Sequence, residues 1–360
     1  MLAVRALPAG HGDCLWLEYG AGRSVRRVLI DGGTTGTYSL LKKTIEDLPA
    51  RQRRFQLVVV THVDIDHVDG IVAMFEDENR PCKVDDVWFN GFPHLPEEQE
   101  NFGPVSGERL TRALIDQGQR WNSDMPRGAA VMISANGPLP SVQLRGGLRL
   151  TVLSPGPRQL GKLRPIWAKA VRDAGLDPAV TAAPPTAKPG WESFGPIDIN
   201  RLADAVSVPD KAVANGSSIA LLAEYSANND TRSVLLASDA HPDVLEESIA
   251  RVRAERGIDR LRVDLFKLPH HGSQGNVSRG LLEQIDCHSY LFSTNGAYFR
   301  HPDREAVARV IKYGGEEPRL VFNYLTDHNR MWDDPGLMDQ YGYSVQYPED
   351  QLAGIEVSLQ

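Results

Sequence analysis

The stretch Thr61-His62-Val63-Asp64-Ile65-Asp66-His67 carries four potential metal ligands within six residues. It follows residues 55–60, an apolar and β-branched run of strand length that predicts a buried strand. In an extended turn after a strand, alternate side chains share a direction, so we expect His62, Asp64 and Asp66 to point the same way. His67 would follow at the start of the next turn, where Gly70 permits a tight path.

These side chains favour a divalent cation. Imidazole and carboxylate together suit zinc or, as a harder ion, manganese. Closely packed carboxylates repel one another unless a cation lies between them. The alternative is a solvated acidic loop with two surface histidines, and the burial expected for residues 55–60 argues against it. The stretch therefore predicts a metal site.

Two further apolar strands end in ligand residues. Residues 234–237 lead into Ser238-Asp239, and residues 262–267 lead into Pro269-His270-His271-Gly272-Ser273. Because three separate strands each end in Asp or His, we expect the ends to converge at one edge of a sheet. The two oxygens of Asp239 suit it to bridge two cations. One of His270 and His271 is expected to ligate, and His270 is the favoured ligand, while the other orients a neighbour or contacts substrate.

Composition is that of a globular protein without a strong preference for polyanions. The 360 residues are 41% hydrophobic and 24% charged, and 39 Lys and Arg stand against 47 Asp and Glu, for a net charge of -8. Such a balance argues against a protein that coats nucleic acid. The three cysteines, Cys14, Cys82 and Cys287, form no CxxC pair, which indicates a reducing compartment. We expect each to be a small buried side chain. With no apolar run long enough to span a bilayer, we expect a cytoplasmic protein without a membrane partner.

Most of the chain alternates strand-like and helix-like segments. Residues 39–48 predict a helix with Ser39 as its N-cap. We expect one domain over residues 1–325, interrupted by two irregular insertions at about 92–144 and 158–212, and a tail at 326–360 that packs on the core. The insertions are expected to cover the mouth of the site, with mobile surface loops as the alternative. Later strands are predicted at residues 218–224, 233–237, 262–267, 289–293 and 320–323, and later helices at residues 242–255, 278–285 and 302–313.

Several short motifs resemble those of one hydrolase family. Asp31-Gly32-Gly33, the 62–67 stretch, Ser238-Asp239 and Pro269-His270-His271-Gly272-Ser273 occur in the order seen in metallo-β-lactamase-fold hydrolases. Three more segments are similar to the metallo-hydrolase domain of the competence protein ComEC, a DNA-uptake protein: Gly10-His11-Gly12-Asp13, Asn215-Gly216-Ser217-Ser218, and Asn295 to His301-Pro302. The resemblance implies an α/β fold of four layers, αββα, with two bound divalent metal ions. Zinc is the favoured metal, and manganese is the alternative.

The resemblance also implies roles for individual residues. His62 and Asp64 would bind one metal and Asp66 and His67 the other, with Asp239 between them and His270 completing the second. Asp31 would orient a ligand imidazole, unless it is only a turn residue. His301 would contact substrate or act as a general acid, unless it only precedes a helix. The residues expected to line the pocket or support the ligands are His11, Asp13, Asn215, His271 and Ser273.

The sequence departs from the fold's commonest pattern, His-x-His-x-Asp-His, at Asp64. ComEC-like proteins also carry Asp at this position, and the change makes one metal site richer in oxygen. The usual middle histidine ligand has no obvious counterpart, and Asn215 lies near where it would fall.

The predicted function is metal-dependent hydrolysis of a phosphodiester, in nucleic acid or a nucleotide-like molecule. Asp66 and His301 are the predicted catalytic residues, and the bound metals would lower the pKa of a water molecule. One alternative is a hydrolase of a carboxylic ester, thioester, lactone or β-lactam. Another is a metal-stabilised module of a larger assembly, in which residues 324–360 dock a protein partner. A homo-oligomer also remains open.

Overall fold

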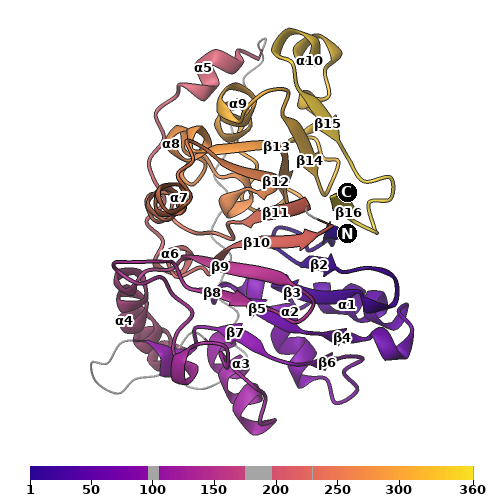
Figure 1. Cartoon of the computed structure of the whole chain (residues 1–360), viewed down its shortest axis with the longest axis vertical. Coiled ribbons are helices and arrows are strands. Elements are labelled where there is room, and N and C mark those ends of the chain that lie inside the picture. The colour runs from indigo at the N-terminus through magenta and orange to yellow at the C-terminus, as the bar shows by residue number, and fades with distance from the viewer. Residues whose placement is uncertain (96–104, 175–196, 229, 360) are drawn as a thin grey trace.

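Two mixed β-sheets pack face to face and helices cover their outer faces in the computed structural model of the chain (Figure 1). The structure describes residues 1–95, 105–174, 197–228 and 230–359. The largest hydrophobic core contains side chains of both sheets, such as Leu17 and Leu235, and continues onto the helices of the second sheet. A second core joins the first sheet to its own helices through side chains such as Val58 and Ile71. The layer order is αββα, which confirms the predicted fold class.

The first sheet has the strand order β16-β1-β2-β3-β5-β7. Its strands are β1 (Leu2–Ala6), β2 (Leu15–Tyr19), β3 (Arg26–Ile30), β5 (Leu57–Val60), β7 (Val87–Phe89) and β16 (Ile355–Leu359). β3, β5 and β7 are parallel, and β5 is buried along its whole length, which explains its apolar sequence. The predicted strand at residues 55–60 is divided, because Phe55 belongs to β4 (Arg54–Phe55), which pairs with β6 (Lys83–Val84) in a separate small sheet.

The second sheet has the order β15-β14-β13-β12-β11-β10-β9-β8. Its strands are β8 (Ser141–Gln143), β9 (Leu148–Ser154), β10 (Ala220–Ala227), β11 (Asp230–Leu236), β12 (Leu261–Lys267), β13 (Ile285–Phe292), β14 (Arg319–Phe322) and β15 (Ser344–Gln346). The strands from β11 to β15 are parallel. The carboxyl ends of β11 and β12 are therefore neighbours at one edge, as ligand sites in α/β folds require.

The helices predicted at residues 39–48, 242–255, 278–285 and 302–313 form within a few residues of those positions, as α1 (Thr37–Glu46), α7 (Pro242–Arg256), α8 (Arg279–Glu283) and α9 (Arg304–Tyr313). The structure also contains α2 (Ile65–Glu76), α3 (Val105–Asp116), α4 (Pro157–Ala174), α5 (Ile199–Ala203), α6 (Val213–Gly216) and α10 (Pro335–Tyr341). The predicted cap at Ser39 is wrong, because α1 already begins at Thr37 and Gly36 is its N-cap. The Ser39 hydroxyl instead donates a hydrogen bond to the Gly36 carbonyl oxygen.

The ligand stretch is also more helical than predicted. α2 begins directly after Asp64, so Asp66 and His67 lie in its first turn instead of an extended loop. Gly70 lies inside α2 and serves close packing rather than a turn. A Cβ atom at Gly70 would lie 2.0 Å from the carbonyl oxygen of Gly32, so only glycine lets α2 approach this loop so closely.

The segments predicted as insertions and tail contain regular structure. The tract 92–144 holds α3 and β8, and the tract 158–212 holds most of α4 and α5. The prolines at positions 178, 184, 185, 189 and 196 lie outside the described residues. After residue 325 the chain forms α10, β15 and β16 (Figure 1). β15 pairs with β14 and β16 pairs with β1, so this segment supplies an edge strand to each sheet.

Cys14, Cys82 and Cys287 are all buried and free, as predicted. Burial raises the pKa of the Cys82 thiol to about 11, which leaves it protonated at neutral pH. No helix in the described part of the chain is both long and apolar enough to cross a membrane.

Candidate metal centre

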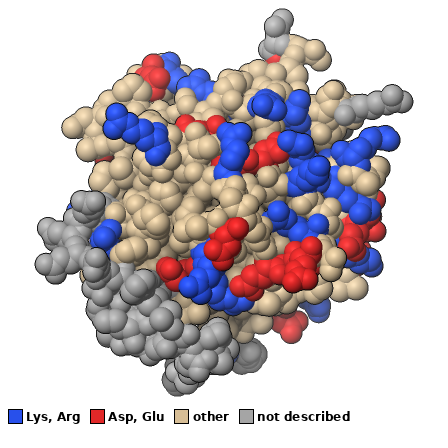
Figure 2. Space-filling view, turned by 90° about the horizontal axis from the view of Figure 1, so that it is seen from below, with Lys and Arg blue, Asp and Glu red and all other residues tan. Residues whose placement is uncertain are grey.

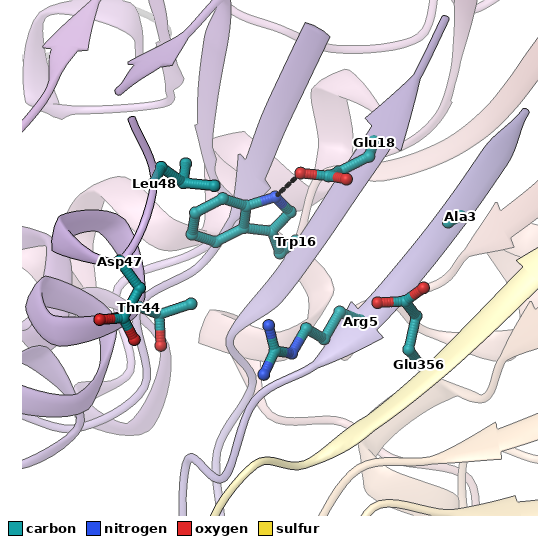
Figure 3. A pocket seen from close by; sticks show the side chains of 8 residues that line it. All are labelled: Ala3, Arg5, Trp16, Glu18, Thr44, Asp47, Leu48 and Glu356. Atoms are coloured by element: carbon teal, nitrogen blue, oxygen red, sulfur yellow. Dashed lines mark hydrogen bonds between the residues drawn. The ribbon is translucent and has the colours of Figure 1, made fainter. Parts of the chain in front are cut away.

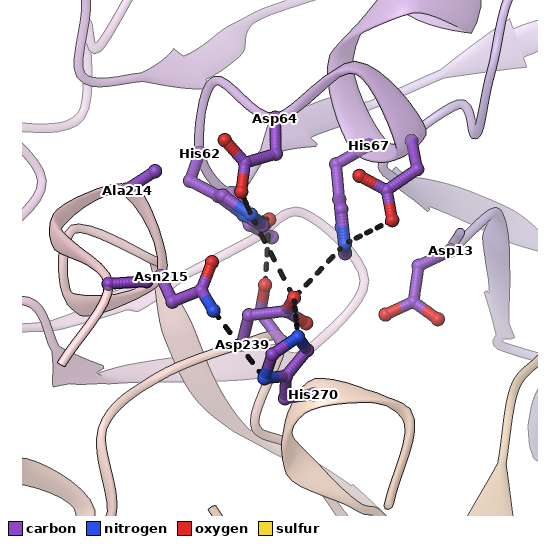
Figure 4. A network of polar contacts seen from close by, with 12 residues as sticks. Asp13, His62, Asp64, His67, Ala214, Asn215, Asp239 and His270 are labelled. Atoms are coloured by element: carbon purple, nitrogen blue, oxygen red, sulfur yellow. Dashed lines mark hydrogen bonds and ion pairs between the residues drawn. The ribbon is translucent and has the colours of Figure 1, made fainter. Parts of the chain in front are cut away.

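Histidines from three segments surround the carboxylate of Asp239 (Figure 4). Asp239 Oδ2 lies 3.5 Å from Nε2 of His67 and 3.9 Å from Nε2 of His62. It lies 3.8 Å from Nε2 of both His270 and His271. His62 follows β5 of the first sheet, whereas the other strands involved, β11 and β12, belong to the second. The centre therefore spans the edges of two sheets and not the single edge that was predicted.

The remaining carboxylates of the 62–67 stretch divide between two sides of the cluster. Asp64 Oδ2 lies 3.6 Å from His62 Nε2. Asp66 Oδ2 lies 3.9 Å from His67 Nε2 and 3.8 Å from His271 Nε2. The sequence favours His270 as the partner of Asp66 and His67, but the structure places the imidazole of His271 there. Both rings of the double histidine face Asp239, but only His271 also approaches Asp66.

A buried hydrogen bond orients the ring of His67 so that Nδ1 faces away from the cluster. Its Nδ1 lies 2.8 Å from Asp31 Oδ2, and because a carboxylate only accepts, Nδ1 is the donor. Nε2 faces Asp66 and Asp239, and it carries a lone pair when the ring is neutral. The arrangement matches the orienting role predicted for Asp31, whose side chain also accepts from the backbone N–H of Thr61.

The same reasoning applies to His62 and His271. The Thr61 hydroxyl donates its single hydrogen to Asp31 and accepts a hydrogen bond from the Ser238 hydroxyl. It has no hydrogen left to donate to His62 Nδ1, which lies 3.0 Å away, so that nitrogen is the donor. His271 Nδ1 donates to the backbone carbonyl of Ser293 at 2.7 Å. Each imidazole thus turns Nε2 toward Asp239, and the neutral ring with its proton on Nδ1 is the form in which histidine binds a metal through Nε2.

The inward-facing nitrogen and oxygen atoms of the cluster suit a divalent cation in both chemistry and spacing. The Nε2 atoms of His62, His67 and His271, and Oδ1 of Asp239, are buried without a hydrogen-bond partner. Leaving such atoms unsatisfied is costly, so native structures rarely do so without a ligand. Two ligand atoms that each lie about 2.1 Å from a tetrahedral cation are about 3.4 Å apart, which is close to the observed distances between the Nε2 atoms and Asp239 Oδ2. Buried triads able to hold an ion include His62–His67–Asp239 and Asp66–His67–His271.

Four residues of the centre hold a left-handed backbone conformation without being glycine. Their φ angles are 58° at Asp31, 48° at Ser238, 47° at His270 and 54° at His271. Each costs about 1–3 kcal/mol and persists only where surrounding contacts impose it. Such strain is characteristic of functional sites, since it aims side chains that relaxed turns would direct elsewhere.

The charges of the centre depend strongly on one another. Burial lowers the pKa of His67, but the carboxylates of Asp239, Asp66 and Asp31 outweigh it and raise this pKa well above 6.5. For Asp239, burial raises the pKa, and the nearby histidines overcome that effect and hold it well below the usual value. Without a cation, protons on histidine therefore balance the buried carboxylates. A metal ion would replace those protons.

Asp210 and Asn276 support His270 and were not predicted. Asn276 Oδ1 lies 3.0 Å and Asp210 Oδ2 3.4 Å from His270 Nδ1. Asp210 also accepts from Nδ2 of Asn215 at 2.7 Å, which brings Asn215 beside His270 (Figure 4). The Asp210 segment is fastened by the buried guanidinium of Arg309, which donates to carbonyl oxygens of residues 203 and 205. Asp210 lies far from the histidines in sequence and carries no motif, so sequence gave no signal for it.

Lys267 is a second unpredicted member of the centre. Its ammonium group is completely buried and forms an ion pair with Asp13, which is also buried. Asp13 Oδ1 lies 3.5 Å from His271 Nδ1, so the pair adjoins the ligand cluster. Burial raises the pKa of Asp13, but the charge of Lys267 outweighs burial and keeps the carboxyl ionised. An apolar strand ending in lysine is the only sequence signal for this residue.

Other predicted residues lie near the centre without joining the cluster. The ring of His301 meets that of His270 edge-on, with centroids 5.2 Å apart and an interplanar angle of 68°, and its Nδ1 lies 3.5 Å from Asp303 Oδ1. His11 stacks on Tyr298. The Ser273 hydroxyl accepts a hydrogen bond from the backbone N–H of Gly275 and so belongs to the turn after the double histidine.

A hollow of about 180 Å³ lies apart from this centre, between the end of α1 and strands β1, β2 and β16 (Figure 3). Trp16 forms one wall and donates from Nε1 to Glu18 Oε1 at 3.0 Å. Arg5, another lining residue, donates to the backbone carbonyl of Ala353. None of the residues that line this hollow is a histidine, and the grouped candidate metal ligands of the described residues lie elsewhere.

The chain matches no protein-family model and no curated protein sequence. Among solved structures, it is similar to the metallo-β-lactamase-fold protein YhfI of Bacillus subtilis, at 10% identity over 99% of this chain and 98% of that one, with a TM-score of 0.38. A diphosphatase of the PhnP family shares 12% identity over 100% and 98%, with a TM-score of 0.36. The subclass B3 metallo-β-lactamase BJP-1 of Bradyrhizobium japonicum shares 12% over 73% and 75%, with a TM-score of 0.30.

Proposed function

We propose that the chain is a metal-dependent hydrolase that acts on a phosphodiester of nucleotide-like size. The observation that carries the proposal is the convergence of the Nε2 atoms of His62, His67 and His271 on the buried carboxylate of Asp239. We assign His62, Asp64 and His270 to one divalent ion, and Asp66, His67 and His271 to a second, with Asp239 shared. Zinc suits the imidazole-rich side and manganese remains compatible with the carboxylates.

Bound divalent ions would supply Lewis acidity and a water molecule of lowered pKa. The residues of the chain supply the positioning. Asp31 and the Ser293 carbonyl hold the imidazoles of His67 and His271 with their lone pairs inward. Asn276 and Asp210 do the same for His270. Because these contacts exist before substrate arrives, little reorganisation is needed during the reaction.

Two considerations favour a small phosphodiester. Paired metal ions stabilise both the attacking and the leaving oxygen of an in-line displacement at phosphorus. The short motifs of the chain also resemble the ComEC hydrolase domain more closely than other branches of the fold. The net charge of -8 weighs against wide contact with a duplex. On the described part of the face in Figure 2, basic and acidic side chains are interspersed, which likewise supports a small ligand over a long polyanion.

The test is hydrolysis of bis(p-nitrophenyl) phosphate by purified protein loaded with zinc or manganese. We expect turnover that a chelator abolishes and that Asp66→Ala lowers by at least about 100-fold, since the loss of a metal ligand removes several kcal/mol of stabilisation. Asp69→Ala is the matched control, because Asp69 lies in the same helix and contacts Thr35 instead of the cluster. It should keep wild-type activity.

The same preparation should be assayed against a β-lactam, a thioester, a lactone and an aryl ester. Turnover of one of these without phosphodiester hydrolysis would move the assignment to the carbon-centred alternative. Metal binding without turnover of any substrate, together with a constant protein partner, would favour a structural module instead.

A further inference from the structure

Aromatic side chains lie along one side of the metal centre, on the loop between β13 and α9. The ring of Phe299 stacks on His301 at a centroid distance of 5.9 Å and an interplanar angle of 24°. Its centroid is 6.3 Å from that of His270, and the centroid of His301 is 5.2 Å from His270. Because His270 Nε2 faces Asp239 at 3.8 Å, these rings lie directly beside the proposed ligands.

A second loop holds the rings from the other side. His11 stacks on Tyr298 at 4.9 Å and 21°, and Tyr298 meets Phe299 edge-on at 4.5 Å and 84°. The two loops are joined by a hydrogen bond from the N–H of Asn295 to the carbonyl oxygen of Gly10, at 2.8 Å. We call His11, Tyr298, Phe299 and His301 the aromatic rim. Its rings are packed on one another and on fixed backbone, so it is organised before a ligand binds.

The side chain of Phe299 is 44% exposed. Ile65, which lies between two proposed metal ligands, is 56% exposed. Single exposed apolar side chains are common and need no explanation by themselves. Here both stand next to a buried cluster of histidines and carboxylates, where an organic substituent of a bound phosphate would have to lie.

We propose that the aromatic rim binds a flat aromatic ring of the substrate, packed against the exposed part of Phe299. This inference rests on the proposed function, since it places the phosphoryl group at the metal centre. Aromatic rings stack on nucleobases with little regard to base identity, because every base has a π-face. A nucleobase and a simple aryl group share this chemistry, so the experiment has to separate them.

The experiment measures binding, not turnover, by isothermal titration of zinc-loaded protein with four phosphate monoesters. Adenosine 5′-monophosphate is compared with ribose 5-phosphate, which lacks only the base. Phenyl phosphate is compared with methyl phosphate, which lacks only the aryl ring. We expect each ring-bearing ligand to bind roughly tenfold more tightly than its partner, as one stacked ring does in other proteins.

Phe299→Ala should remove most of this preference and leave ribose 5-phosphate and methyl phosphate binding unchanged. Phe299→Trp should keep the preference. Leu352→Ala is the matched control, because Leu352 is 77% exposed on the turn before β16 and should change nothing. A preference for adenosine 5′-monophosphate alone identifies a nucleobase as the ring, and a preference for phenyl phosphate as well extends the site to aryl groups.

The proposal is overturned if wild-type protein binds members of each pair equally, or if Phe299→Ala keeps the preference. Failure of the proposed function gives a different result. In that case the preference for ring-bearing ligands persists while metal-loaded protein hydrolyses no phosphodiester.

Discussion

Asp31 Oδ2 accepts a hydrogen bond from His67 Nδ1 at 2.8 Å, although 36 residues separate the two in sequence. This contact connects the end of β3 to the first turn of α2. It also determines which nitrogen of His67 faces the other proposed ligands. The orientation of a buried imidazole is therefore set by a carboxylate that itself lies outside the ligand cluster.

Asp31→Asn should weaken zinc binding by about 10–100-fold, because the carboxylate that holds His67 and increases its basicity is lost. Competition with a chromophoric chelator measures the affinity. Asp86→Asn is the matched control, since Asp86 is equally buried but accepts from Val87 and Ser123, away from the centre. Equal zinc affinity of Asp31→Asn and wild type would contradict the orienting role.

Zinc affinity should rise with pH up to about pH 9. Burial lowers the pKa of His270, but the charges of Asp239 and Asp210 raise it above its ordinary value of 6.5, to about 9. Zinc needs the neutral ring, so below pH 9 it must displace a proton from His270, and the apparent affinity should fall at least about tenfold per pH unit between pH 9 and 7, since His67 also has a raised pKa. The protonated ring stabilises the metal-free fold fully below about pH 6.5, and this stabilisation is lost as pH rises through 9.

The titration of His270 can be followed by NMR in the metal-free protein. Asp210→Asn should lower the pKa of His270, because it removes one of the charges that raise it. The pH dependence of zinc binding should then shift to lower pH. A zinc affinity that is constant between pH 7 and 9 would show that zinc does not displace a proton from His270.

The sequence predicted the convergence of ligand residues from local patterns, whereas the four-layer fold was implied by the resemblance of short motifs to metallo-β-lactamase-fold hydrolases. Strand ends are marked by apolar runs, and His62, Asp239 and His271 follow such runs directly. Asp210 follows no run, and its contact with His270 depends on how a long connection returns to the sheet edge. Tertiary topology, rather than propensity, decides such contacts.

The choice between His270 and His271 was also beyond local pattern. Both residues have left-handed φ angles, which sequence does not signal for histidine. Both rings turn Nε2 toward Asp239, and each is held there by the acceptor that its Nδ1 finds, the Ser293 carbonyl for His271 and Asn276 for His270.

Lys267→Met should destabilise the metal-free protein by about 3–5 kcal/mol, because it leaves the buried carboxylate of Asp13 without its partner. Urea unfolding measures the change. The double variant Lys267→Met/Asp13→Asn should recover part of the loss, since it removes the uncompensated charge. If the single and double variants are equally unstable, the cost arises from packing and not from the buried charge.

Gly70→Ala should lower the free energy of unfolding by about 1–3 kcal/mol or more, because the added methyl group would lie 2.0 Å from the Gly32 carbonyl oxygen. α2 would have to move away from the loop that carries Asp31, so zinc affinity should fall together with stability. Gly161→Ala in α4 is the matched control, because its Cβ meets nothing within 4 Å. There the helix propensity of alanine should stabilise the protein by up to about 1 kcal/mol. Equal effects of the two substitutions in thermal and urea unfolding would mean that α2 can yield, and that the close approach of Gly70 to Gly32 does not hold the ligands in place.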